Sequence, residues 1–141
     1  MKSLLFHCKK FNAKITGVST RGVDVSPEKI NKKIHKHDSN IAAFITVESG
    51  DNFNQIVSNI SNDIKKFCLE TKEDQIVLFP FAHLSSNLAS FKDGIKFFDM
   101  LEKELNLKNK NLSISRVHFG SDKDLLLHIW GHPGNVRFRE Y

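Results

Sequence analysis

The sequence predicts a mixed-sheet α/β or α+β domain, and three observations support this fold class. Two short apolar runs rich in β-branched residues, 41–47 and 76–79, are typical of central strands covered on both faces. Each run is followed by a segment whose apolar residues recur at helical spacing. Further candidate strands lie near both ends of the chain, and this order favours one mixed sheet packed against helices.

The amino-terminal segment is expected to form a hairpin. Residues 3–8 are a short apolar stretch, and Phe11, Ala13 and Ile15 alternate with polar residues at period two, as in a half-buried strand. Residues 27–37 show no clear periodicity, so we expect them to be helical or irregular.

The first predicted helix lies between the two apolar runs. Asp51 or Asn52 can cap its first turn by accepting hydrogen bonds from unpaired backbone N–H groups. Its apolar residues trace one stripe of the helix surface: Phe53, Ile56, Val57, Ile60, Ile64, Phe67 and Cys68.

A second helix is expected from Ser90 to about Asn106. Ser90 and Asp93 form a capping-box-like pattern at its start. The side chains expected to be buried are Phe91, Ile95, Phe98, Leu101 and Leu105. Two more strands, 112–119 and 123–130, are expected to flank a turn at Gly120-Ser121-Asp122.

Length and composition exclude several classes of protein. A chain of 141 residues with 40% hydrophobic and 26% charged residues fits one domain, 1–141, that needs neither disulfides nor a structural metal to fold. Its apolar runs are far shorter than the roughly 20 residues of a transmembrane helix. Because the first residues also lack a secretory signal, we expect a cytoplasmic protein that does not contact a membrane. Cys8 and Cys68 form no paired motif and are expected to be buried thiols.

Positive charge is concentrated in the first quarter of the chain. Residues 1–37 contain nine Lys or Arg and two acidic residues, a net charge of +7, whereas 38–75 carry −4 and 76–141 carry +2. This distribution and a pI near 9.3 favour a nucleic-acid partner, because basic residues neutralise phosphates. A generally Lys-rich composition gives the same balance without RNA, so both interpretations stay open.

The histidines predict no metal site and no cofactor. His35 and His37 lie among lysines and are interpreted as part of a solvated basic face. His128 and His132 are a close pair, but a zinc site needs a third ligand and supporting hydrogen bonds that no pattern supplies.

The first candidate site follows the buried run 76–79. Pro80, Phe81, Ala82 and His83 lead into Ser85 and a second serine, and such loops at the carboxyl ends of central strands often build sites. The alternative is a purely structural loop in which the serines shape the turn and His83 bonds to the backbone.

The second candidate site is Phe119-Gly120-Ser121-Asp122-Lys123, followed by Gly131-His132-Pro133. A lysine beside a turn glycine can be held over the same carboxyl-end cleft as His83. In a partly desolvated site its ammonium would stabilise a developing oxyanion or bind a phosphate.

Together these segments resemble the amino-terminal editing domain of archaeal-type threonyl-tRNA synthetases. The resemblance is carried by residues 78–88, by Phe119-Gly120-x-x-Lys123 and by Gly131-His132-Pro133. The opening residues 4–7 and the strand 43–48 are similar to that family too, so the match spans essentially the whole chain.

The resemblance implies a D-aminoacyl-tRNA deacylase-like fold and hydrolysis of serine mischarged onto tRNA(Thr), by a freestanding protein or by the editing domain of a synthetase. The expected partners are the tRNA(Thr) 3′ end carrying serine, a second copy in a homodimer, and a threonyl-tRNA synthetase catalytic chain or domain. Lys123 and His83 match the catalytic positions of the family. The substrate-binding residues expected beside them are His7, Pro80, Phe81, Ala82, Phe119, Gly120 and Asp122.

Three positions depart from the family pattern. Asp122 stands where the family usually has a tyrosine, Val136 where it has a glutamate, and His118 where it has a proline. Asp122 can pair with Lys123 and reduce its effect on the substrate.

Acids elsewhere in the chain, Asp124 or Glu140, are candidates to compensate for these changes. Two other functions therefore stay open. One is a catalytically impaired tRNA-binding or dimerisation module with 9–36 as its basic face, and the other is a D-aminoacyl-tRNA deacylase-like enzyme.

Overall fold

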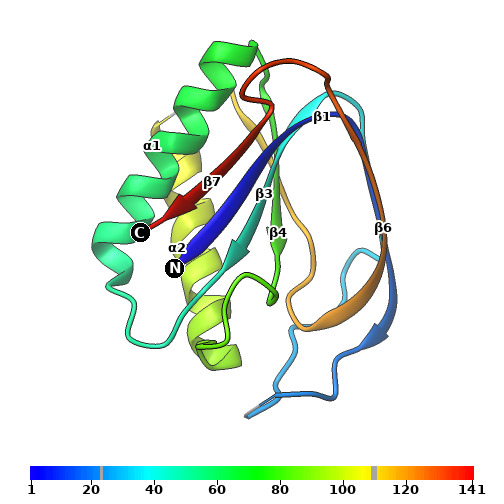
Figure 1. Cartoon of the computed structure of the whole chain (residues 1–141). Helices are drawn as coiled ribbons and strands as arrows, with labels where there is room; N and C mark the ends of the chain where they lie inside the picture. The colour runs from blue at the N-terminus through cyan, green and yellow to red at the C-terminus, as the bar shows by residue number, and fades with distance from the viewer. Residues whose placement is uncertain (23, 109–110) are drawn as a thin grey trace.

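The computed structural model describes residues 1–22, 24–108 and 111–141 of the chain. Within these residues, seven strands form one sheet and two helices pack on it (Figure 1). In chain order the elements are β1 (Lys2–Val18), β2 (Ile34–His37), β3 (Asn40–Thr46), α1 (Phe53–Thr71), β4 (Gln75–Pro80), α2 (Phe91–Lys108), β5 (Ser113–Arg116), β6 (Ser121–Ile129) and β7 (Val136–Glu140).

The first strand is continuous, so the predicted amino-terminal hairpin is wrong. β1 runs for 17 residues and changes register against β6 between Cys8 and Lys10. Such a bulge inserts one residue and shifts the alternation of side chains. As a result, the even-numbered residues before the bulge lie on the same face of the sheet as the odd-numbered residues after it: Leu4, Phe6 and Cys8 with Phe11 and Ala13.

Both edges of β1 carry two antiparallel partners. One edge pairs with β3 and then with β2; the other pairs with β7 and then with β6. β3, β4 and β5 are parallel to one another. β5 pairs with β4, whereas β6 pairs with β1, so the two strands expected to flank the turn at residues 120–122 do not pair with each other.

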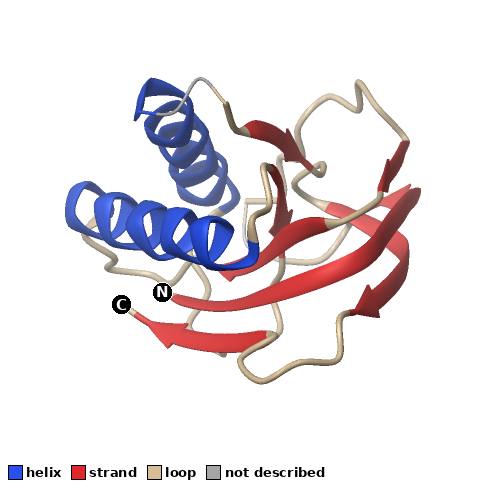
Figure 2. Ribbon diagram, turned by 90° about the horizontal axis from the view of Figure 1, so that it is seen from above, coloured by secondary structure: helices blue, strands red, loops and turns tan. Residues whose placement is uncertain are grey.

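The predicted helices are confirmed, and both cover the same face of the sheet (Figure 2). α1 buries the expected stripe apart from Phe53, which is half-buried. α2 buries Phe98, Leu101 and Leu105 as predicted, but Phe97 takes the place expected for the half-buried Phe91 and Ile95. No helix within the described residues is long and apolar enough to cross a membrane.

A second apolar cluster occupies the face that the helices leave uncovered. It is enclosed because the sheet curls, so that the second half of β1 and β6 approach the end of β4 (Figure 1). Its buried members are Cys8, Phe11, Ala13, Ala42, Phe44, Val77, Phe79 and Val117. This curled, mixed sheet with helices on one face confirms the predicted α+β fold class.

Two strands were not predicted. β2 falls in the segment expected to be helical or irregular, and β7 follows the last expected strand. In β7 the residues Val136 and Phe138 alternate with two arginines, which is the period-two signal of a strand with one apolar face.

Candidate functional site

The loop after β4 is held firmly against the end of β3. We call residues 81–88 the His83 loop. The hydroxyl of Thr46, a side chain on the uncovered face that is 1% exposed, donates to the carbonyl of Phe81 and accepts from the N–H of Leu84 at 3.4 Å. The predicted position of this candidate site, at the carboxyl end of a buried strand, is confirmed.

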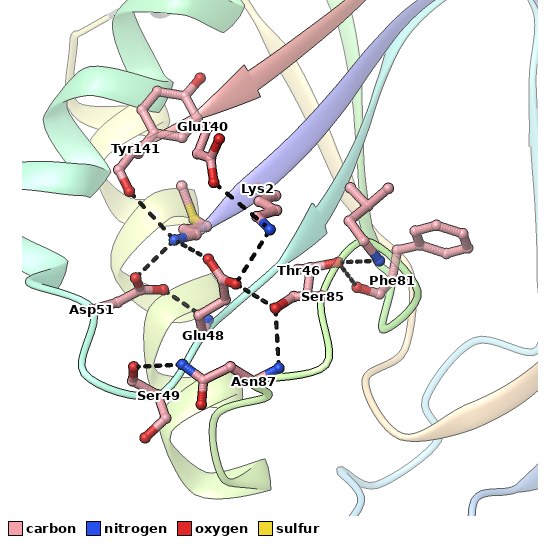
Figure 3. A network of polar contacts seen from close by, with 12 residues as sticks. Lys2, Thr46, Glu48, Ser49, Asp51, Phe81, Ser85, Asn87, Glu140 and Tyr141 are labelled. Atoms are coloured by element: carbon pink, nitrogen blue, oxygen red, sulfur yellow. Dashed lines mark hydrogen bonds and ion pairs between the residues drawn. The ribbon is translucent and has the colours of Figure 1, made fainter.

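Glu48 ties the same loop to the first residue of the chain. Its carboxylate accepts a hydrogen bond from the Ser85 hydroxyl and pairs with the Met1 ammonium at 2.8 Å (Figure 3). Asp51 pairs with the same ammonium at 2.8 Å and accepts from the Glu48 N–H at 2.7 Å. The hydrogen bond from the ammonium, followed by that from Ser85, lowers the pKa of Glu48. The carboxylate is therefore ionised at neutral pH.

β6 carries Lys123 across the uncovered face, in register with Ile15 of β1. Its Nζ lies 5.4 Å from the centre of the Phe79 ring and donates to the carbonyl of Ser121 at 2.7 Å. Burial lowers the pKa of Lys123 from 10.5 to about 8, although the charge of Asp122 acts in the opposite direction. A desolvated ammonium of this kind interacts strongly with an oxyanion or a phosphate.

Aromatic rings connect the lysine to the histidine. The Phe79 ring is 6.3 Å from that of Phe81, and Phe81 is 5.1 Å from the exposed ring of His83, edge to face. Lys123 and His83 thus contact the same aromatic cluster, although the structure shows no hydrogen bond between the two side chains in the part of the chain that it describes.

His35 and His37 project toward the same enclosed region, so their interpretation as a solvated basic face is wrong. His35 is 3% exposed, and the Nε2 atoms of both rings are buried without a hydrogen-bond partner among the described residues. Burial, and next the charge of Lys32, lowers the pKa of His35 to about 4; Lys123 contributes in the same direction. Residues 34–37 alternate in burial along β2, with His35 and His37 on the enclosed side and Ile34 and Lys36 exposed. The sequence itself gives no signal of this, because the apolar Ile34 is on the exposed side.

The remaining residues expected near Lys123 occupy different positions. The Phe119 ring packs 5.9 Å from Phe98 of α2, on the helix side of the sheet. Gly120 adopts φ +81°, and a Cβ there would lie 2.6 Å from the Phe91 ring, so only glycine fits this turn. Asp122 is exposed at the start of β6, next to the lysine.

His7 lies on the helix side of the sheet, away from the His83 loop. It pairs with Ile41 at the amino-terminal end of β3, whereas the loop follows the carboxyl-terminal ends of β3 and β4. Its Nε2 lies 2.9 Å from the Glu73 carboxylate and its Nδ1 lies 2.7 Å from His132. The structure therefore brings His7 together with His132 of the second motif, but with neither the His83 loop nor Lys123.

Neither of the two acids considered as replacements has its side chain beside that of Lys123. Glu140 pairs with Lys2 at 3.7 Å. Asp124 directly follows Lys123 in β6, so it points to the opposite face of the strand, and it is exposed. Val136, at the position of the family glutamate, is 41% exposed on β7.

The architecture matches a known fold. The protein described as "c-Myc DNA Unwinding Element Binding Protein" superimposes on this structure with a TM-score of 0.69 and 11% sequence identity, covering 100% of this chain and 99% of that chain. The chain thus has the predicted D-aminoacyl-tRNA deacylase-like α+β fold.

The amino-acid sequence shows which family the chain belongs to. Residues 1–140 match the family model described as the archaea-specific editing domain of threonyl-tRNA synthetase. The chain therefore belongs to this family, as the resemblance indicated.

The curated relatives carry matching names. The threonine–tRNA ligase of Staphylothermus marinus is 32% identical over 94% of this chain and 21% of its own length. The threonine–tRNA ligase editing subunit of Saccharolobus solfataricus is 36% identical over 76% of this chain and 27% of its own length. The chain thus spans about a fifth to a quarter of the length of these relatives.

Proposed function

We propose that this chain hydrolyses L-seryl-tRNA(Thr) and thereby removes serine that a synthetase has wrongly attached. One observation carries the proposal. The desolvated Lys123 ammonium contacts the aromatic cluster that also contacts His83, and this cluster packs on the sheet face that the two described helices leave uncovered.

The reaction requires an oriented water molecule and one cation in a fixed position. A water molecule attacks the ester carbonyl carbon, the bond to the ribose oxygen breaks, and that oxygen takes up a proton while serine leaves as the acid. The carbonyl oxygen carries negative charge during the attack, and the Lys123 ammonium stabilises it. Because an aminoacyl ester is already activated, no covalent nucleophile is required.

The need for a second site has a simple energetic reason. A pocket built for threonine excludes serine weakly, since one missing methyl is worth only about 1–3 kcal/mol. An editing pocket that is too small for that methyl accepts serine and excludes threonine. In this chain the backbone of Pro80, Phe81 and Ala82 forms the wall of this pocket, and His83 orients the terminal adenosine and serine.

The surface charges support tRNA as the partner. Eight basic residues of the first 37 are exposed, and most lie on the second half of β1, on β2 and in the segment between them: Lys9, Lys10, Lys14, Arg21, Lys29, Lys32, Lys33 and Lys36. We call this set the basic lobe. Its charge would bind RNA phosphates with an affinity that falls as salt rises.

Apolar side chains support a homodimer. Val136 and Phe138 of β7 are 41% and 51% exposed, and they lie beside the half-buried Leu4 and Phe6 on the uncovered face. An apolar patch of this kind is typical of a subunit interface. A second copy of the chain would cover it, and sedimentation equilibrium would then give twice the chain mass. We further propose that the protein acts in the cytoplasm, together with a threonyl-tRNA synthetase catalytic chain or domain.

The first experiment compares release of serine and threonine from tRNA(Thr) by the purified chain. We expect fast release of L-serine and slow release of L-threonine. Release of D-amino acids in preference to L-serine would instead indicate a D-aminoacyl-tRNA deacylase-like enzyme.

A tRNA-binding module without catalysis is the second candidate. It is favoured by Asp122 and Val136, which replace two polar groups of the family site, and by the exposed basic lobe. No release above the buffer rate, with salt-sensitive binding of tRNA retained, would support this function over hydrolysis.

A further inference from the structure

The hydroxyl of Thr46 stands between two backbone groups of the His83 loop. It donates to the carbonyl of Phe81 and accepts from the N–H of Leu84 (Figure 3). These are the first and fourth residues of the segment in which Ala82 and His83 are the middle pair. A tight turn would join this carbonyl and this N–H directly. Here the hydroxyl of a neighbouring strand is inserted between them, so the turn is held open.

The position of the hydroxyl is itself fixed. Thr46 belongs to β3, which is buried along its whole length and bonded to β1 and β4. A β-branched side chain in a strand has few rotamers, so the Thr46 oxygen is restricted in place. The rigid centre of the sheet therefore determines how far apart the ends of the turn lie.

A second anchor holds the other half of the loop. The Ser85 hydroxyl donates to Glu48, and it accepts from the N–H of Asn87 at 3.1 Å (Figure 3). The amide of Asn87 donates to the carbonyl of Ser49 at 3.3 Å. The Phe81 N–H also donates to the carbonyl of Ile45 at 3.0 Å, so both ends of the loop are fixed to the sheet. The Thr46 hydroxyl is the group that lies between the Phe81 carbonyl and the Leu84 N–H.

We propose that Thr46 is a positioning residue that sets the size of the amino-acid pocket and so determines discrimination between serine and threonine. The inference rests on the proposed hydrolysis, with the pocket wall formed by residues 80–82. Without the hydroxyl, the carbonyl of Phe81 and the N–H of Leu84 are free to approach each other. Ala82 and His83 then move, and the wall that excludes the threonine methyl is displaced.

The test uses three variants of the whole chain. Thr46→Val has the same shape but no hydroxyl, and Thr46→Ser keeps the hydroxyl. Ser61→Ala is the matched control, because it removes a fully buried hydroxyl from α1 that has no hydrogen-bond partner among the described residues. Steady-state kcat and KM are measured with seryl- and threonyl-tRNA(Thr), and amide hydrogen exchange of Leu84 reports the bridge directly.

We expect Thr46→Val to reduce the serine-to-threonine ratio of kcat/KM by about tenfold, the factor that corresponds to one buried hydrogen bond. The change should appear in kcat for serine and as new release of threonine, with the melting temperature near that of the unaltered chain. Leu84 should exchange faster. Thr46→Ser and Ser61→Ala should keep the original ratio and exchange rate.

The outcomes separate the two proposals. An unaltered chain that releases neither amino acid would overturn the proposed hydrolysis and the role of Thr46 with it. An active unaltered chain whose ratio is unchanged in Thr46→Val would overturn the role of Thr46 alone. A ratio that falls equally in Thr46→Ser would also count against it, because that variant retains the bridge.

Discussion

Two histidine-containing regions at opposite ends of the sheet differ in how completely their polar groups are paired. Around His7, the ring nitrogens bond to Glu73 and His132, and Ser39 donates to the same carboxylate. Around Lys123, the ammonium has lost much of its solvation without gaining a carboxylate at hydrogen-bond distance, and buried histidine nitrogens lack partners in the described structure.

This difference separates stability from function. A fully paired buried network contributes to folding and has no atom left for a ligand. Burying a cation lowers its pKa and reduces the stability of the folded protein. Groups with shifted pKa values are concentrated at functional sites. The paired region therefore holds the fold together, while the incompletely paired region is the candidate site.

The largest effect is expected at Lys123. Lys123→Ala should reduce hydrolysis of seryl-tRNA(Thr) by about 100-fold or more, as loss of an oxyanion-stabilising group does. The melting curve should change little, because the Lys123 side chain is only partly buried and forms no ion pair in the part of the chain that the structure describes. Lys66→Ala on the exposed side of α1 serves as the control. Full activity in a natively folded Lys123→Ala protein would remove the lysine from the mechanism.

At the opposite end, His7→Phe should affect stability and not activity. It leaves Glu73 and His132 without their shared partner, and it should lower the free energy of unfolding by about 1–3 kcal/mol in urea titrations. His128→Phe, at an exposed position of β6, should be neutral. If His7→Phe abolished hydrolysis in a stable protein, His7 would belong to the site after all.

The pH dependence should reveal the desolvated lysine. The pKa of Lys123 is about 8 in the folded protein and 10.5 when unperturbed. If hydrolysis needs the ammonium, the enzymatic rate, after subtraction of the buffer rate, should fall as the pH rises, with a midpoint near pH 8. The folded state releases its proton first, so this group makes the free energy of unfolding rise with pH between those two values. Lys123→Arg should remove the decline. A rate that increases through this range would mean that the neutral amine is the active form.

The smallest effect is expected on the basic lobe. Lys14 and Lys36 lie on the outer faces of β1 and β2, and the double change Lys14→Glu with Lys36→Glu should weaken binding of uncharged tRNA. The slope of log affinity against log salt should decrease by about 1–2. Filter binding measures both quantities. The same double change at Lys66 and Lys103 of the helices should have little effect, and equal losses in the two proteins would contradict a localised RNA surface.

The central part of the fold could be predicted from the sequence because its signals are local. β3 and β4 are near-continuous apolar runs, and each helix has an apolar stripe at helical spacing. The sequence predicts two strands in place of β1, because the bulge between Cys8 and Lys10 shifts the alternation of side chains by one residue. The pairing of β6 with β1 depends on contacts across the chain that no local pattern encodes.

The candidate site was only partly accessible to prediction. His83 could be found from the end of a buried strand, and Lys123 from a turn glycine followed by a lysine. Thr46 and His35 were missed because a threonine in an apolar run and a histidine among lysines carry no sign of their neighbours. Their surroundings are created by the curl of the sheet, which brings distant strands together.

The pairing of β1 with the last strands has a consequence for synthesis of the protein. β1 is made first, but β6 and β7 along one of its edges are separated from it by more than a hundred residues of chain. The ribosome adds about 5–20 residues per second, so this edge stays unpaired for several seconds during synthesis. The unpaired backbone groups of an exposed strand edge can form hydrogen bonds with a strand of another chain. The charged Lys9, Lys10 and Lys14 along β1 are suited to keep nascent copies apart during that interval.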